Sequence, residues 1–262
     1  DRYREICDAF HWQVPQRFNM GWACCGRWAR ERHRFALYYE DDAGNTGAYA
    51  YWDLQQQANR LANALVALGV KRGDRVAIIL PQRPETAVAH IACYQMGAVA
   101  MPLSILFGPD ALAYRLQNSE AVAALADDVS LPNLVEVRDQ CPLLKHVIGV
   151  AGARDANVHE WDNLLEKAAP RFNRVETDAE DPAVLIYTSG TTGPPKGASV
   201  AHRALLGNLP GFQHSQDLFP LAGDLFWSPA DWAWTGGLMD ALLPTLYYGY
   251  PILGYRGRFD PE

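Results

Sequence analysis

The feature that most constrains the fold of this chain is an alternation between short, uninterrupted apolar runs and longer segments with helical spacing. The run Val76–Leu80 is apolar at every position, which is typical of a strand covered on both faces. Before it, apolar residues recur at helical spacing from Leu54 to Leu68, with Asp53 predicted as the N-cap and Gly69 as the stop. Strands that alternate with helices indicate an α/β fold, a parallel sheet with helices on both faces.

The same alternation continues along the chain. We predict helices over 84–96, 109–118 and 161–168, and strands over 98–101, 121–126, 146–150 and 183–187. The last three residues, Asp260-Pro261-Glu262, have the pattern of a helix start, so we expect the chain to stop at an element boundary.

Composition argues against several kinds of partner. The chain has 30 Asp and Glu against 23 Lys and Arg, a net charge of −7, which disfavours a nucleic acid or an anionic membrane surface. The 5 Cys form no CxxC pair, so we interpret them as small buried residues of a protein in the reducing cytosol. The uncharged stretch 86–109 contains Gly97 and Pro102, so we interpret it as a buried helix and strand, not as a membrane span. The first residues lack the apolar region of a signal peptide.

The segment with the most specific chemistry follows the predicted strand at 183–187. Residues 188–197 read Thr-Ser-Gly-Thr-Thr-Gly-Pro-Pro-Lys-Gly. Glycines let backbone N–H groups approach an anion, hydroxyls add donors and can ligate Mg²⁺, and a lysine supplies positive charge. The residues therefore predict a phosphate-binding loop, with a surface turn as the alternative. Gly197 after the lysine excludes a Walker loop, and no GxGxxG dinucleotide motif occurs.

Residues 187–197, Tyr-Thr-Ser-Gly-Thr-Thr-Gly-Pro-Pro-Lys-Gly, resemble the signature loop of the AMP-forming adenylating enzymes, which include acyl-CoA synthetases, luciferases and nonribosomal adenylation domains. His202 lies where a histidine often follows that loop. The resemblance covers residues 18–262. Further segments that carry it are 73–78 and 97–103, and, for the acetyl- and medium-chain acyl-CoA synthetase branch, 18–19 and 28–29.

The resemblance implies a reaction in two steps. The carboxylate of a small-molecule acid attacks the α-phosphorus of ATP to form acyl-AMP and pyrophosphate, and the thiol of CoA then displaces AMP. ATP, Mg²⁺ and CoA as co-substrate are implied with it. By resemblance, Lys196 and Thr191 are catalytic, and Thr191 is also the Mg²⁺ ligand. The implied nucleotide-binding residues are Thr188, Ser189, Gly190, Thr191, Thr192, Gly193 and Lys196.

A second block, residues 228–237, resembles the family segment that forms a wall of the acyl pocket. Gly237 stands where many relatives carry a histidine or another aromatic residue. The stretch from Ala204 to Tyr255 contains no Lys or Arg, which suits a neutral pocket and is equally explained by burial. The tryptophans of this block suit the wall of a pocket, and packing in the protein core explains them equally well. The expected pocket residues are Asp231, Trp232, Trp234, Thr235 and Gly236.

The family's later elements, among them a Tyr-Gly-x-Thr-Glu segment and a lysine-bearing lid, do not occur in this sequence. We therefore expect the first portion of the family's N-terminal domain, without efficient catalysis of its own. We divide it into an extension at 1–35, a first α/β subdomain at 36–180, and the phosphate-loop strand with the start of a second, incomplete subdomain at 181–262. A carrier-protein-loading ligase and a non-catalytic nucleotide-binding remnant remain alternatives.

Overall fold

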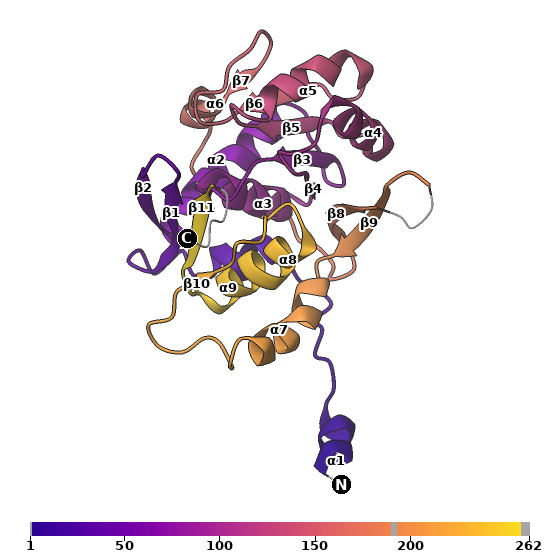
Figure 1. Ribbon diagram of the computed structural model, residues 1–262. Coiled ribbons are helices and arrows are strands. Elements are labelled where there is room, and N and C mark those ends of the chain that lie inside the picture. The colour runs from indigo at the N-terminus through magenta and orange to yellow at the C-terminus, as the bar shows by residue number, and fades with distance from the viewer. Residues whose placement is uncertain (1, 190–192, 258–262) are drawn as a thin grey trace.

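The computed structural model describes residues 2–189 and 193–257. A seven-stranded sheet forms its centre, in the order β7-β6-β5-β3-β4-β8-β9 (Figure 1). Neighbouring strands run parallel except for β9, which is antiparallel to β8. The strands are β3 (Arg75–Ile79), β4 (Val99–Pro102), β5 (Ala123–Ala126), β6 (His146–Gly149), β7 (His159–Glu160), β8 (Pro182–Thr188) and β9 (Lys196–Ala201).

Helices cover both faces of this sheet, as predicted. Ile78 packs into the cluster that holds α2 (Tyr51–Ala67), α3 (Pro84–Met96) and α6 (Trp161–Lys167). Its neighbour Ile79 points to the opposite face, into the cluster that holds α4 (Pro109–Ser119) and α5 (Leu131–Val137). Successive strand residues therefore serve two cores, which is why the strands are apolar at every position. The predicted α/β fold with helices on both faces of a parallel sheet is confirmed.

A second sheet of four strands, in the order β10-β11-β1-β2, joins distant parts of the chain. Its central pair is parallel and aligns Leu37 with Ile252 and Asp41 with Arg256. The sequence analysis did not predict this sheet. Its strands are β1 (Phe35–Asp41), β2 (Thr46–Ala50), β10 (Phe226–Trp227) and β11 (Ile252–Arg256).

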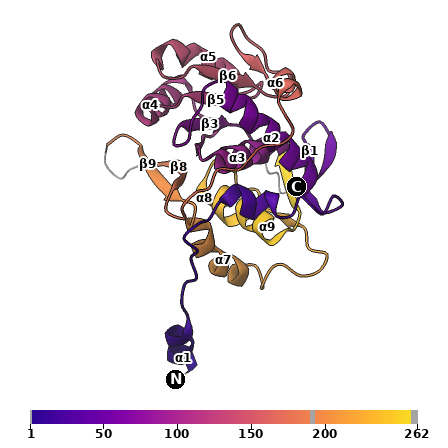
Figure 2. The same cartoon turned by 180° about the vertical axis from the view of Figure 1, so that it is seen from behind.

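Several short helices accompany the small sheet and the N-terminal region (Figure 1). They are η1 (Trp22–Gly26), α7 (Ala204–Ser215), α8 (Thr235–Gly237), η3 (Leu238–Leu242), α9 (Leu243–Tyr248) and the turn η2 (Arg138–Gln140) that follows α5. The π-helix η1 is anchored in the core by Cys24 and Cys25. The first helix, α1 (Arg2–Ala9), projects away from the body in both views (Figure 2).

The predicted helix boundaries agree closely with the structure, with one correction. Helix α2 begins at Tyr51, so Asp53 is not the N-cap but the third helical residue, and its carboxylate accepts the Ala50 N–H at 2.9 Å. Tyr51 is fully buried and its hydroxyl donates to the Tyr250 carbonyl at 3.0 Å, which places the helix start three residues earlier than predicted. The helix start predicted at 260–262 lies outside the described residues.

The cysteines are free, and four of them are buried, as expected, while Cys7 is exposed. Burial raises the pKa of Cys24 and of Cys93 to about 12, so both stay protonated thiols at neutral pH. Across residues 2–189 and 193–257, no helix is both long enough and apolar enough to cross a bilayer.

Candidate functional site

The predicted phosphate loop lies between the two antiparallel strands β8 and β9, which form one edge of the large sheet (Figure 1). Its first and last described positions face each other, because Thr188 pairs with Lys196. Thr188, Ser189, Gly193 and Lys196 are all exposed. Within the described part of the chain, the Lys196 ammonium has no ion-pair partner. These donors are therefore open to a ligand from solvent.

Three of the predicted loop residues, Gly190, Thr191 and Thr192, lie outside the described residues. The predicted roles of Thr191 in catalysis and Mg²⁺ binding stay predictions. Among residues 2–189 and 193–257, no group of three or more His, Cys, Asp or Glu side chains could hold a metal ion.

The chain after the loop is a strand, which distinguishes this site from phosphate loops that open a helix. The strand that follows the loop supplies no helix dipole of its own. Among the described residues of the loop, Lys196 carries the positive charge.

The base of the hairpin is anchored to α4. Tyr187 is 3% exposed, and its hydroxyl donates to the Asn118 side chain at 2.6 Å. The Tyr114 hydroxyl donates to the Pro195 carbonyl at 3.0 Å. Burial raises the pKa of Tyr187, which keeps its hydroxyl protonated as a donor. Both arms of the loop are thus tied to one helix, and this attachment limits where its exposed donors can move.

Arg115 on the same helix is a buried cation that contacts aromatic rings. Its guanidinium lies 4.1 Å from the ring centre of Phe107 and 5.6 Å from that of Tyr187. Burial lowers the pKa of Arg115. On its other side, Phe107 meets the Trp234 ring edge-on at 5.9 Å. A continuous row of side chains therefore joins the hairpin to the segment predicted to form the acyl pocket.

His202, which follows β9, has a structural role here. Its Nδ1 accepts the Met20 N–H at 3.1 Å, and its ring meets the Tyr94 ring edge-on. Burial lowers the pKa of His202 to about 4, so the imidazole is neutral. It joins the N-terminal segment to the end of the hairpin.

The five predicted pocket residues divide between core and surface. Trp232 is fully buried, whereas Trp234 is 42% exposed. Thr235 and Gly236 are exposed at the start of α8. Asp231 is partly buried: its carboxylate accepts the Ala233 N–H at 2.9 Å and the Ser104 hydroxyl at 3.3 Å. Burial raises the pKa of Asp231. Core packing thus accounts for Trp232, while Trp234 lies where a ligand can reach it.

Gly237 is required by backbone packing. A Cβ at this position would lie 2.1 Å from the Asp231 carbonyl oxygen, far inside contact distance. The sequence suggested that this position lacks an aromatic pocket side chain. The structure leaves no room for any side chain there, because the turn before α8 closes directly on it.

Sequence reasoning missed several residues around the site: Gln82, Ser104, Phe107, Tyr114 and Arg115. Each follows the carboxyl end of a parallel strand or lies on the helix after one, which is where ligand sites form in α/β sheets. The predicted order of strands and helices was the only available signal for them.

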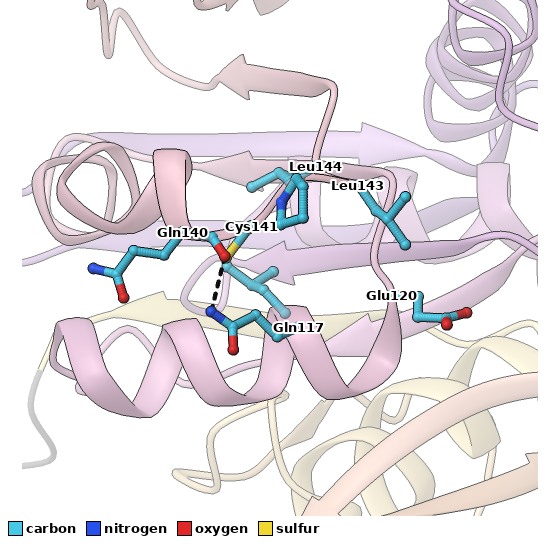
Figure 3. A pocket seen from close by; sticks show the side chains of 8 residues that line it. Gln117, Glu120, Gln140, Cys141, Leu143 and Leu144 are labelled. Atoms are coloured by element: carbon cyan, nitrogen blue, oxygen red, sulfur yellow. Dashed lines mark hydrogen bonds between the residues drawn. The ribbon is translucent and has the colours of Figure 1, made fainter.

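A pocket of about 360 Å³ lies elsewhere, between the end of α4 and residues 140–144 (Figure 3). Gln117 and Glu120 line it, and the Gln117 amide donates to the Gln140 carbonyl at 2.8 Å. It opens at the amino ends of β5 and β6, the opposite end of the sheet from the hairpin loop. It is therefore separate from the candidate site.

Comparison with known proteins identifies related sequences. Residues 26–261 match the family model described as AMP-binding enzyme. An acetyl-coenzyme A synthetase of Streptomyces coelicolor is 30% identical over 95% of this chain and 42% of its own length. The corresponding enzyme of Escherichia coli K12 is 32% identical over 94% of this chain and 40% of its own length.

Solved structures show the same fold. An acyl-CoA synthetase of Brucella canis superposes with a TM-score of 0.87 at 26% identity, over 99% of this chain and 48% of that chain. An anthranilate CoA ligase in complex with anthranoyl-AMP superposes with a TM-score of 0.82 at 21% identity, over 93% of this chain and 46% of that chain, and supports the fold alone. The chain thus spans less than half the length of these relatives.

Proposed function

This chain belongs to the AMP-binding enzyme family, and from that premise we propose that it is the nucleotide-binding N-terminal part of an AMP-forming acid–CoA ligase. The observation that carries the proposal is the hairpin between β8 and β9, with exposed hydroxyls and Lys196 at its ends. This loop is attached through α4 to the aromatic segment around Trp234. A nucleotide site and an acid site would lie on either side of one helix.

In the proposed reaction, an acid carboxylate attacks the α-phosphorus of ATP, acyl-AMP forms, and pyrophosphate leaves. An anion then has to approach a polyanion, so the charge on the departing phosphates must be stabilised. Lys196 supplies a cation, and Thr188 and Ser189 supply hydroxyl donors. Hydroxyl oxygens also suit Mg²⁺, for which we propose Thr191 as a ligand; the ion would neutralise phosphate charge.

We further propose that Trp234, Thr235 and Gly236 border the acid, with Asp231 and Trp232 supporting them from below. Reaction of the acyl-AMP with the thiol of CoA would complete the cycle. We retain the boundaries 36–180 and 181–262 for the two subdomains as part of this proposal. Because the chain spans about 40% of its relatives' length, efficient turnover would depend on further elements.

The test is ATP–pyrophosphate exchange in the complete natural protein that contains this chain, across a panel of short, medium and aromatic carboxylic acids. Lys196→Ala should slow exchange by about 10²–10³-fold, the loss typical for one preorganised donor to developing charge. Lys167→Ala, which removes an exposed lysine from α6, is the matched control and should retain wild-type exchange. Wild-type exchange by Lys196→Ala would refute the assignment of the loop.

Two further readouts separate the alternatives. Acyl-CoA formation on addition of CoA supports the acid–CoA ligase. Transfer of the acyl group to a carrier protein but not to CoA would identify a carrier-protein-loading ligase. Nucleotide binding without exchange for any acid would identify a non-catalytic remnant.

A further inference from the structure

Gln82 is a buried amide at the junction of the two sheets. It follows β3 and is only 6% exposed. Its Nε2 donates to the carbonyls of Ser228 at 3.0 Å and Ala230 at 2.7 Å. Its Oε1 accepts the N–H of Tyr255 on β11 at 3.2 Å. Both amide hydrogens and the amide oxygen are thus used, each by a backbone group of another segment.

These contacts lie at the point where ligands bind in many α/β sheets. The chain places β4 on one side of β3 and β5 on the other, and the crevice between the ends of β3 and β5 is such a switch point. Here, Arg83 and Asp127 follow the ends of these two strands and lie 3.6 Å apart. Arg256 of β11 reaches the same Asp127 carboxylate at 3.4 Å. The chain's own strand β11 therefore occupies this crevice.

The segment held by Gln82 leads directly into the proposed acid-binding residues. Ala230 precedes Asp231, and Trp234 follows four positions after Ala230. Trp232 is fully buried, and a Cβ added to Gly254 of β11 would lie 3.1 Å from its ring. The packing of Trp232 against β11 leaves little freedom for the segment that follows Ser228. The Gln82 side chain links this segment to the end of β3 by hydrogen bonds.

We propose that Gln82 is a positioning residue for the acid pocket. Its side chain holds the segment from Ser228 to Trp234 in a fixed position relative to the end of β3. The inference rests on the proposed function for its catalytic consequence. An amide is required because two carbonyls need donors and one N–H needs an acceptor. A carboxylate of the same shape has no donor and faces two carbonyl oxygens. A methionine of similar size removes all three hydrogen bonds and leaves three partly buried backbone groups without this partner.

The experiment compares Gln82→Glu and Gln82→Met with Gln117→Glu in the complete natural protein. Gln117 is a matched control because its amide also donates to a backbone carbonyl, but in the pocket of Figure 3. Steady-state kinetics give KM for the acid and for ATP. Hydrogen–deuterium exchange of peptides covering 226–236 and 84–96 reports whether the segment loses protection while α3 keeps it.

We expect both Gln82 variants to raise KM for the acid by about tenfold, as loss of the three hydrogen bonds to backbone groups implies. KM for ATP should stay within about twofold, because the hairpin is attached through α4 and not through Gln82. Exchange should accelerate in 226–236 and not in 84–96. Gln117→Glu should leave both KM values and the exchange of 226–236 as in wild type.

Unchanged exchange of 226–236 in both Gln82 variants overturns the inference, whatever the kinetics. Faster exchange in both peptides with parallel rises of both KM values also overturns it, since Gln82 would then serve global stability alone. Absence of pyrophosphate exchange by wild type with every acid refutes the proposed function and with it the pocket role. The exchange data still decide separately whether Gln82 holds the segment.

Discussion

Because two histidines are buried, we predict that the folded chain loses stability in mild acid. His90 and His202 are both fully buried, and burial lowers their pKa values to about 3 and about 4. The His90 Nδ1 lies 2.9 Å from the Tyr94 hydroxyl, and a second proton on the imidazole would place a charge in the core. The unfolded chain accepts that proton near pH 6.5.

The size of the effect follows from linkage. Each folded-state pKa lies below the unfolded value, so the full stability is present above pH 6.5 and is lost as the pH falls toward 4 for His202 and toward 3 for His90. Each group contributes about 1.4 kcal/mol per pH unit in that window. Between pH 6.5 and pH 5, the two histidines together should lower the free energy of unfolding by about 3 kcal/mol.

The assay is urea unfolding at pH 7 and at pH 5, followed by tryptophan fluorescence, for wild type and for His90→Gln, His202→Gln and the double variant. Each single variant should remove about half of the histidine-dependent pH effect, because glutamine does not titrate. Other titrating groups cancel in the difference between variant and wild type. Single and double variants with the wild-type pH dependence would refute the reasoning, as would a difference between wild type and the double variant below about 1 kcal/mol.

Three substitutions test other parts of the structure, each by chemical or thermal unfolding. Gly237→Ala should lower the stability of the fold by about 1–3 kcal/mol, because the added Cβ meets a backbone carbonyl. Gly236→Ala is the control, since there is open space around that position, and equal effects of the two variants would contradict this account. Arg83→Met should lower the stability of the fold by about 3–5 kcal/mol, because the fully buried Asp127 carboxylate would lose one of its cationic partners. Unchanged stability would show that the fold does not need the Arg83–Asp127 ion pair. Tyr187→Phe should cost about 1–2 kcal/mol through loss of its bond to the asparagine on α4, and wild-type stability would argue against that anchor.

Local signals in the sequence were sufficient for most helices and strands. Helix α3 runs from Pro84 to Met96 as predicted, because proline favours the first helical turn and Gly97 ends the helix at φ +74. The start of α2 was predicted wrongly at Asp53, since a buried contact of Tyr51 with residues far along the chain outweighs the capping preference. Local rules fail where a distant partner supplies more free energy.

A phosphate-binding loop was predicted from the residue types at 188–197, but the structural surroundings of this segment were not predicted. The order of hydroxyls, glycines and lysine is a local property, so a sequence shows it directly. That the loop closes an antiparallel hairpin on α4 depends on Tyr114 and Tyr187, whose partners lie 81 and 69 residues away. No periodicity encodes such contacts.

The sequence by itself determined the α/β class and the order of the central elements, and it predicted the chemistry of the loop, because each depends on residues a few positions apart. Only the tertiary structure revealed that β11 pairs with β1 and occupies the crevice beside β3. Gln82 reaches partners 146 and 173 residues away, and its amide carries no local mark of them. The physical reason is that a buried polar group is defined by what surrounds it, and its surroundings exist only after the chain has folded.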